Sequence, residues 1–255
     1  MNPNALRAVA LMALLCPLAA VAGPPADVEI FDRTSGRLLP VYWHAGERHV
    51  AGEPGHEYEI RLRNRTRGRV LAVTSVDGVN VLSGRTASAD QGGYVMDPRG
   101  RLAVDGWRKN MDEVAAFYFT SLPDSYAART GRPDNVGVIG VALFREQAEA
   151  PAKRLSSADR AEAPPPTASQ ESDRTGRMSG IVGEDSRLGT GHGQRLDSGA
   201  VYTRFERASE TPEAVIRIFY DSERNLVAQG IIPRPRHHYA QQVPDPFPGG
   251  FVPDP

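Results

Sequence analysis

The sequence predicts an all-β protein, built mainly as an immunoglobulin-like or jelly-roll-like β-sandwich. Residues 24–145 are rich in β-branched and aromatic side chains, and Gly, Pro and Asp-Gly interrupt them. Short strand-like runs recur there with a turn about every 8 to 12 residues, the spacing typical of such sandwiches. A small C-terminal β element is expected to follow this domain after a disordered linker.

Two neighbouring runs carry the strongest strand signal. Polar and apolar residues alternate strictly over Glu57–Arg63, which predicts a strand with one face toward solvent. Val70–Val76 predicts a second strand. The dipeptide Asp77-Gly78 follows it and favours a type I′ hairpin turn, leading to a strand at Val79–Leu82.

Two further runs are apolar on both faces. Val114–Thr120 and Val136–Phe144 are therefore expected to be central strands of the core. Between them, Pro123–Pro133 predicts a long loop with one helical turn at Tyr126–Arg129. Weaker strand signals lie at Val28–Asp32, Leu38–His44, Gly93–Met96 and Leu102–Asp105.

The C-terminal segment predicts three strands, at Val201–Phe205, Val215–Tyr220 and Leu226–Ile231. A competing interpretation makes Thr211 the N-cap of a helix that begins at Pro212. The β-branched and aromatic run that follows favours the strand. Three strands make a thin unit, so this segment is expected to dock on the first domain.

The chain is thus divided by composition. From 146 it becomes rich in Ala, Glu, Pro, Ser and Arg, which cannot bury enough apolar area to offset the entropy of ordering. The expected order is a signal peptide (1–22), the β-sandwich (24–145), a disordered linker (146–177), a small β-rich segment (178–232) and a Pro-rich disordered tail (233–255).

The first residues predict export. Arg7 precedes the apolar run Ala8–Val21, and small residues end it, which is typical of a signal peptide cleaved after Ala22. We therefore expect a periplasmic or secreted protein of a Gram-negative bacterium. No later run is long enough to span a bilayer, so no transmembrane segment is expected in the mature chain. The only cysteine, Cys16, lies inside the leader, and the mature chain would have no disulfide.

Charge and motifs exclude several function classes. The formal net charge is −1, so no global field attracts the chain to nucleic acid, and no nucleic-acid partner is expected. The spacing of His44, His49 and His56 does not specify a metal site, and neither a metal nor a cofactor is predicted. No pattern indicates an oligomeric state.

Alternate arginines are the first candidate contact. Arg61, Arg63, Arg65, Arg67 and Arg69 would line one face of a continuous strand, where they could bind phosphate or sulfate groups of an envelope polymer. If instead residues 64–68 form a turn, the guanidinium groups splay apart and only a solvated strand face remains.

The run Trp107-Arg108-Lys109 is the second candidate contact. An exposed indole beside two cations would suit sugar stacking or a protein partner. The alternative is an indole that closes one end of the sandwich.

The run Gly189–Gly193 contains the best catalytic candidate. It lacks the spacing and the lysine of a phosphate-binding loop, and predicts a flexible turn ahead of a strand. His192 within it is accessible and titrates near neutrality. It is therefore the best candidate for a general base, with Asp185 or Asp197 as its carboxylate.

Two sets of motifs resemble a group of exported, uncharacterised proteobacterial proteins. The first set comprises Val73–Val81, Gly106–Lys109 and Glu113–Phe117; the second comprises Leu188–Gly193, Phe205–Ser209 and Tyr220–Ser222. The resemblance covers most of residues 27–145 and 186–232. It implies export and a two-part layout, and it supplies no activity and no catalytic residues.

Three functions are consistent with these patterns. The favoured hypothesis is a non-catalytic exported β-sandwich protein of the cell envelope that binds a protein or a glycan. One alternative is a periplasmic hydrolase that uses His192. The other is an envelope assembly or structural factor that acts through its Pro-rich tail, bound as polyproline II.

Overall fold

The structure is a computed structural model, and it describes residues 23–148 and 187–233. The predicted signal peptide, residues 149–177 of the predicted linker, residues 178–186 of the predicted β-rich segment and residues 234–255 of the predicted tail lie outside the described residues. Neither described helix is long and apolar enough to cross a membrane.

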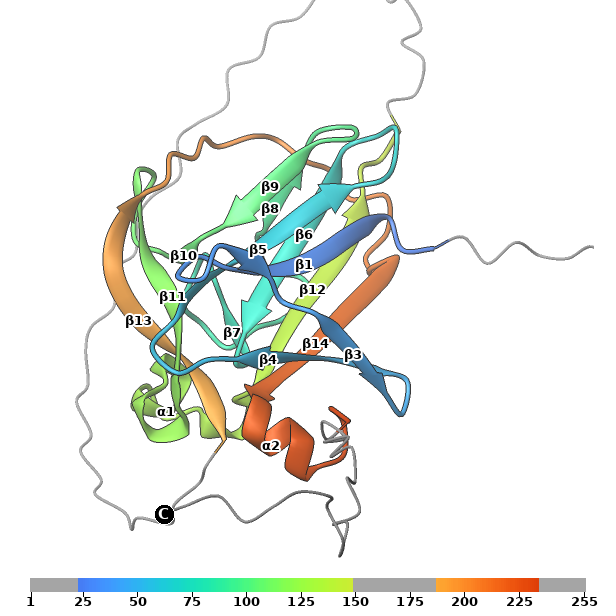
Figure 1. Cartoon of the computed structure of the whole chain (residues 1–255). Helices are drawn as coiled ribbons and strands as arrows, with labels where there is room; N and C mark the ends of the chain where they lie inside the picture. The colour runs from blue at the N-terminus through green and yellow to red at the C-terminus, as the bar shows by residue number, and fades with distance from the viewer. Residues whose placement is uncertain (1–22, 149–186, 234–255) are drawn as a thin grey trace, which may run out of the picture.

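Two β-sheets, with seven strands each among the described residues, form the body of the molecule (Figure 1). Sheet A contains β1 (Ala26–Asp32), β2 (Arg37–Leu38), β5 (Glu57–Asn64), β9 (Arg101–Val104), β10 (Gly106–Arg108), β11 (Glu113–Ser121) and β13 (Leu188–Asp197). Sheet B contains β3 (Val41–His44), β4 (Glu47–Gly52), β6 (Val70–Val76), β7 (Val79–Asn80), β8 (Tyr94–Met96), β12 (Val138–Arg145) and β14 (Ala214–Ser222). The helical elements are η1 (Leu122–Asp124), α1 (Tyr126–Arg129), η2 (Pro133–Asn135) and α2 (Glu223–Ala228).

The core lies between the two sheets, so the predicted all-β sandwich fold is confirmed. Ile60 and Leu62 of β5 are buried as the alternation predicts, and they join one apolar cluster with Ile139 and Leu143 of sheet B. Burying such side chains contributes about 1.5–3 kcal/mol each. The two runs predicted as central strands are β11 and β12, and each has strands paired on both sides.

The C-terminal residues supply one strand to each sheet. In sheet A, β13 pairs antiparallel with β11. In sheet B, β14 lies between β12, to which it is antiparallel, and β4, to which it is parallel. The strand interpretation of Val215–Tyr220 is therefore correct, and the helix that would begin at Pro212 is absent from this described segment.

Two predicted C-terminal strands are wrong. Val201–Phe205 is irregular, with Tyr202 92% exposed, and Phe205 packs on the outer face of sheet B. Leu226–Ile231 lies in and just after helix α2. The side chain of Ser222 caps its first turn by accepting a hydrogen bond from the Asn225 amide, and Gly230 follows its end with a φ of +75°.

The predicted flexible turn at Gly189–Gly193 is also wrong, because these residues lie within β13. A Cβ at Gly191 would be 2.2 Å from the Tyr118 ring on β11. One at Gly189 would lie 2.6 Å from the Cβ of Ser125. These two glycines therefore allow β13 to approach its neighbours closely, and they do not mark a bend.

The hairpin at Asp77-Gly78 is confirmed. Both residues have positive φ, +52° and +73°, as a type I′ turn requires. The predicted strand after it is shorter and ends at Asn80. The predicted strand Leu38–His44 is divided at Pro40, so that β2 belongs to sheet A and β3 to sheet B.

Candidate functional site

The arginine series does not form one continuous stripe, because β5 ends at Asn64 and the chain leaves the strand before β6 begins at Val70, as the alternative predicts. The first member of the series, Arg61, is also engaged by neighbouring groups. The Nε of Arg61 donates to Glu59 at 2.6 Å, and its guanidinium lies 3.4 Å from the centre of the Phe31 ring. Arg61 is thus part of a polar network on the outer face of sheet A.

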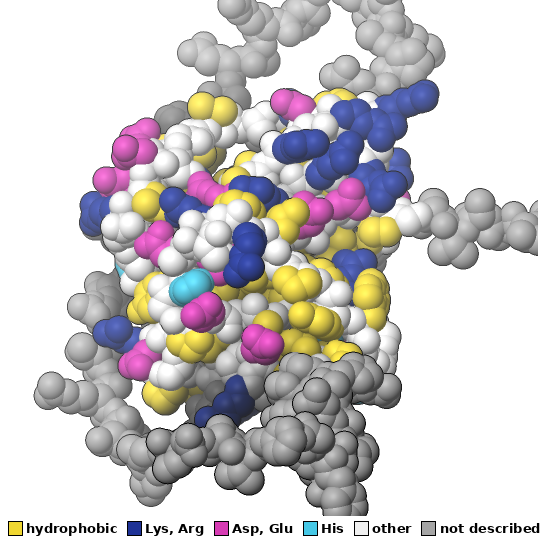
Figure 2. Space-filling view, in the orientation of Figure 1, with side chains coloured by type: hydrophobic (Ala, Val, Ile, Leu, Met, Phe, Trp, Pro, Cys, Tyr) yellow, Lys and Arg dark blue, Asp and Glu magenta, His cyan; other side chains and the backbone are white. Residues whose placement is uncertain are grey.

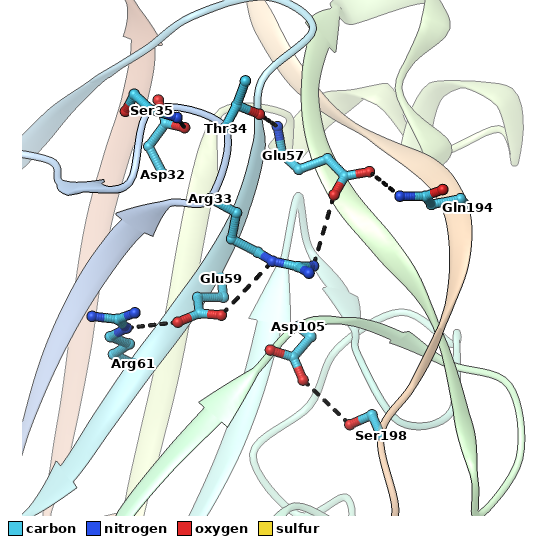
Figure 3. A network of polar contacts seen from close by, with 10 residues as sticks. All are labelled: Asp32, Arg33, Thr34, Ser35, Glu57, Glu59, Arg61, Asp105, Gln194 and Ser198. Carbon is cyan, nitrogen blue, oxygen red and sulfur yellow. Dashed lines mark hydrogen bonds and ion pairs between the residues drawn. The ribbon is translucent and has the colours of Figure 1, made fainter.

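Figure 3 shows this network. Arg33 lies between Glu57 and Glu59, at 3.8 and 4.0 Å. Burial, and then the neighbouring carboxyl of Glu59, raise the pKa of Asp105. The carboxyl groups of this network outnumber its two guanidinium groups, so this face does not favour an anionic ligand.

Asn64, the last residue of β5, organises the end of the sandwich beyond it. Its side chain is 1% exposed. Its Nδ2 donates to the carbonyls of Gly68 and Asp97, each at 2.8 Å, and its Oδ1 accepts from the amide and the hydroxyl of Thr66. One buried amide thereby joins the β5–β6 turn to the β8–β9 turn.

These two turns and the adjoining strand ends bear a group of exposed arginines, which we call the arginine cluster. Its members are Arg63, Arg65, Arg67, Arg99 and Arg101. Figure 2 shows basic side chains gathered at the upper right, where Figure 1 places the two turns.

Most of this positive charge is not neutralised. Within the described residues only Arg65 of the cluster forms an ion pair, with Asp27 at 3.1 Å. Arg63 and Arg101 lie directly opposite each other on β5 and β9. Like charges at opposed positions destabilise a sheet, and a bound anion would relieve this repulsion.

The backbone conformation of Arg99 is a second source of strain in the arginine cluster. Asp97 to Gly100 form a turn closed by a 2.9 Å hydrogen bond from the Gly100 amide to the Asp97 carbonyl. Arg99 has a φ of +60° in this turn, at the position where glycine is favoured. A left-handed conformation costs an arginine about 1–2 kcal/mol. Strained residues of this kind concentrate at functional sites.

The patterns considered in the sequence did not point to Arg99 and Arg101. The signal that could have found them is the run Pro98-Arg99-Gly100-Arg101, a turn with an arginine on each side of a glycine. Its position beside the β5–β6 turn depends on the pairing of β9 with β5, which no short-range pattern specifies.

A cleft of about 700 Å³ lies next to the arginine cluster. Its lining includes Thr66, Arg69, Arg145 and Arg204. The basic groups of this cleft are paired: Arg69 with Glu146, Arg145 with Glu213 and Arg204 with Glu206. The cleft therefore extends the site with polar groups and adds little net charge.

The predicted contact at Trp107 is not exposed, and the alternative, an indole that closes the sandwich, is correct. Trp107 is 3% exposed, and its Nε1 donates to the carbonyl of Gly191 at 3.0 Å. Arg108 donates to the Tyr94 hydroxyl at 3.0 Å and also to the carbonyl of Ser198. Of this predicted trio only Lys109 is exposed.

His192 is exposed on β13, and its ring packs against Tyr126 with centroids 5.7 Å apart. Partial burial, and then the positive charge of Lys109, lower its pKa. Arg129 and Arg195 act in the same direction. The surroundings of His192 are therefore cationic, and no carboxylate orients its ring among the described residues. Asp185 lies outside the described residues.

The three histidines considered for a metal do not converge. His56 hydrogen-bonds Asp32 at 2.7 Å, whereas His44 and His49 lie on the β3–β4 hairpin with ring centres 6.3 Å apart. The described part of the chain contains no group of three or more potential ligands placed to hold a metal.

The most strongly perturbed carboxyl group is Asp77, at the opposite end of the sandwich from Asn64. Its carboxylate accepts hydrogen bonds from the Tyr220 hydroxyl at 2.5 Å, the Thr190 amide at 2.8 Å and the Gly137 amide at 2.9 Å. The Thr190 hydroxyl also bonds the hydroxyls of Tyr220 and Tyr58, each at 2.7 Å.

Burial raises the pKa of Asp77 to about 6, although these hydrogen bonds oppose the shift. Asp77 is only 1% exposed, and the 700 Å³ cleft does not reach it. This network connects β5, β13, β14 and the β6–β7 turn. We therefore assign it a structural role, joining the two sheets.

No protein-family model, curated protein or solved structure matches this chain.

Proposed function

We propose that this chain is a non-catalytic exported protein of the cell envelope, and that it binds an anionic glycan through the arginine cluster. The observation that carries the proposal is a set of exposed guanidinium groups, of which only that of Arg65 has a carboxylate partner among the described residues, on and beside two turns that the buried side chain of Asn64 joins. The signal-peptide pattern supports the cellular location.

The chemistry favours phosphate or sulfate groups as the ligand. A guanidinium group presents several donors in one plane and bonds such oxyanions in pairs. Arg63 and Arg101 are neighbours on adjacent strands, which lie about 4.8 Å apart, so one oxyanion can contact both. Arg67 and Arg99 lie on the two joined turns, so successive groups of a polymer can be bound at once.

A charge-reversal experiment tests this proposal. Arg63→Glu/Arg101→Glu should weaken binding to dextran sulfate by about tenfold or more at low salt, because favourable contacts become repulsive. The salt dependence of the binding constant should also become less steep. Titration calorimetry or a fluorescence assay at several salt concentrations measures both quantities.

The matched control is Arg85→Glu/Arg224→Glu, which makes the same change in net charge at two exposed arginines outside the cluster. At about 0.15 M salt it should alter the affinity less than about twofold, because charges more than about 8 Å from the ligand are then largely screened. Equal losses in both double variants would contradict the proposal. So would equal affinity for dextran sulfate and uncharged dextran, or tighter binding to a DNA oligonucleotide than to dextran sulfate.

A further inference from the structure

A second surface, formed by β2 and β3, exposes apolar side chains at a sheet edge. β2 and β3 are the edge strands of sheets A and B on the same side of the sandwich. Leu38 is 50% exposed, Val41 39% and Trp43 64%. We call these three residues the Trp43 edge. Exposed apolar edge strands are uncommon without a partner, because their open backbone groups attract other segments.

A shallow groove of about 310 Å³ adjoins the Trp43 edge. Trp43 lines it, together with Arg48 and Arg217. The guanidinium of Arg48 lies 5.1 Å from the centre of the Trp43 ring, and Arg217 pairs with Glu47 at 3.2 Å. Among the described residues that line the groove, two arginines face one carboxylate, and the exposed Arg37 lies nearby on β2.

The described chain ends against the other face of β3. Ile231 and Ile232 pack with Leu226 of α2, and Tyr42 of β3 packs against the same cluster. Pro233 is the last described residue, and successive side chains of a strand point to opposite faces, so a segment that reaches Trp43 from here has to pass around the edge of β3. Residues 234–242 can span at most about 30 Å when extended, and the four residues of β3 cover only about 13 Å. The segment from 243 onward can therefore reach the whole Trp43 edge.

We propose that residues 243–255 of the same chain dock on the Trp43 edge. This segment combines prolines with Phe247 and Phe251, and it carries Asp245 and Asp254 without any lysine or arginine. Proline-rich segments bind surfaces with exposed aromatic rings at a small entropic cost, because their backbone is already restricted. The two aspartates complement the excess positive charge around the groove.

The fluorescence of Trp43 in the full chain tests this proposal. The sequence has two tryptophans, and Trp107 is buried, so most of the acrylamide-quenchable signal comes from Trp43. A Trp43→Phe variant gives the residual signal to subtract. Phe247→Ser/Phe251→Ser should raise the quenching constant of Trp43 about threefold, because the ring loses its cover. Asp245→Lys/Asp254→Lys should act in the same direction, most strongly at low salt.

The control is Gln241→Ser/Gln242→Ser, which changes two neighbouring polar residues outside the docking segment and should leave the quenching constant unchanged. A Trp43 that is as quenchable in the wild type as a free indole would overturn the proposal. Shielding that disappears on dilution would also overturn it, since that result assigns the surface to a second copy of the chain.

Discussion

The two ends of the sandwich are each held together by one short polar side chain at a strand end, and they differ in the chemistry of that side chain. At one end, the amide of Asn64 joins two turns. At the other, the carboxyl of Asp77 joins the β6–β7 turn to β13 and β14. Both residues are 1% exposed.

The difference determines what each end can do. An amide has no charge to lose or gain, so the turns bound by Asn64 keep their geometry over a wide pH range, and their arginines remain available to a ligand. A buried carboxyl ties the stability of its end to proton concentration. The arginine cluster can thus serve to bind a ligand, whereas the Asp77 network holds the two sheets together.

Removing the carboxyl should have the largest effect on stability. Asp77→Ala leaves the Tyr220 hydroxyl and the amides of Thr190 and Gly137 without their acceptor in the core. We expect a loss of about 4 kcal/mol in the free energy of unfolding, measured by urea denaturation. Asp77→Asn keeps the side-chain shape and tolerates positive φ, so it should cost about 1–2 kcal/mol. A cost below about 1 kcal/mol for the alanine variant would refute the structural role.

The pH dependence of stability should be the next largest effect. The pKa of Asp77 is about 6 in the folded state, against an ordinary value of 3.8. Between these two pH values the folded state holds a proton that the unfolded state has released. The contribution of Asp77 to stability is therefore greatest below pH 3.8 and is lost as the pH rises through 6. The two-unit shift corresponds to about 3 kcal/mol.

This effect is isolated by comparing the wild type with Asp77→Asn in urea at pH 4, 5, 6 and 7. The difference between their unfolding free energies should change by about 2.4 kcal/mol across this range, because pH 4 already lies slightly above the unfolded pKa. Other titrating groups, including Asp105 and Asp32, are present in both proteins and cancel. A constant difference would show that Asp77 does not titrate in this window.

The smallest predicted effect separates stability from binding at the arginine end. Arg99→Gly relieves the left-handed strain and should raise the free energy of unfolding by about 0.5–1 kcal/mol, after the larger backbone entropy of glycine is included. The same variant should bind dextran sulfate more weakly, with the salt slope reduced by about one. A variant that is both more stable and equally tight-binding would remove Arg99 from the site.

Much of the fold could be predicted because its strands carry local signals. The alternation in β5 and the Asp-Gly turn after β6 depend only on neighbouring residues. The glycines of β13 could not be interpreted locally, because their reason is the Tyr118 ring on another strand. The capping serine Ser222 and the terminating glycine Gly230 did signal α2, but the apolar run between them also suits a strand.

The candidate site was predictable only in part, for the same reason. The β5–β6 turn is local, so the sequence pointed to Arg63 and to the series after it. The turn that bears Arg99 reaches that site through the pairing of β9 with β5, which is a long-range contact. The exposure of the two tryptophans likewise depends on tertiary packing: Trp107 lies in the core, whereas Trp43 lies on an edge strand.

The position of β14 between β4 and β12 limits when sheet B can fold. The β3–β4 hairpin joins the rest of sheet B only through β14, which is among the last parts of the described chain to be synthesised. In a nascent chain that stops before residue 214, β4 and β12 each have one unpaired edge, and open strand edges promote aggregation. Assembly must therefore await the arrival of β14, and the many contacts between distant parts of the chain favour slow folding.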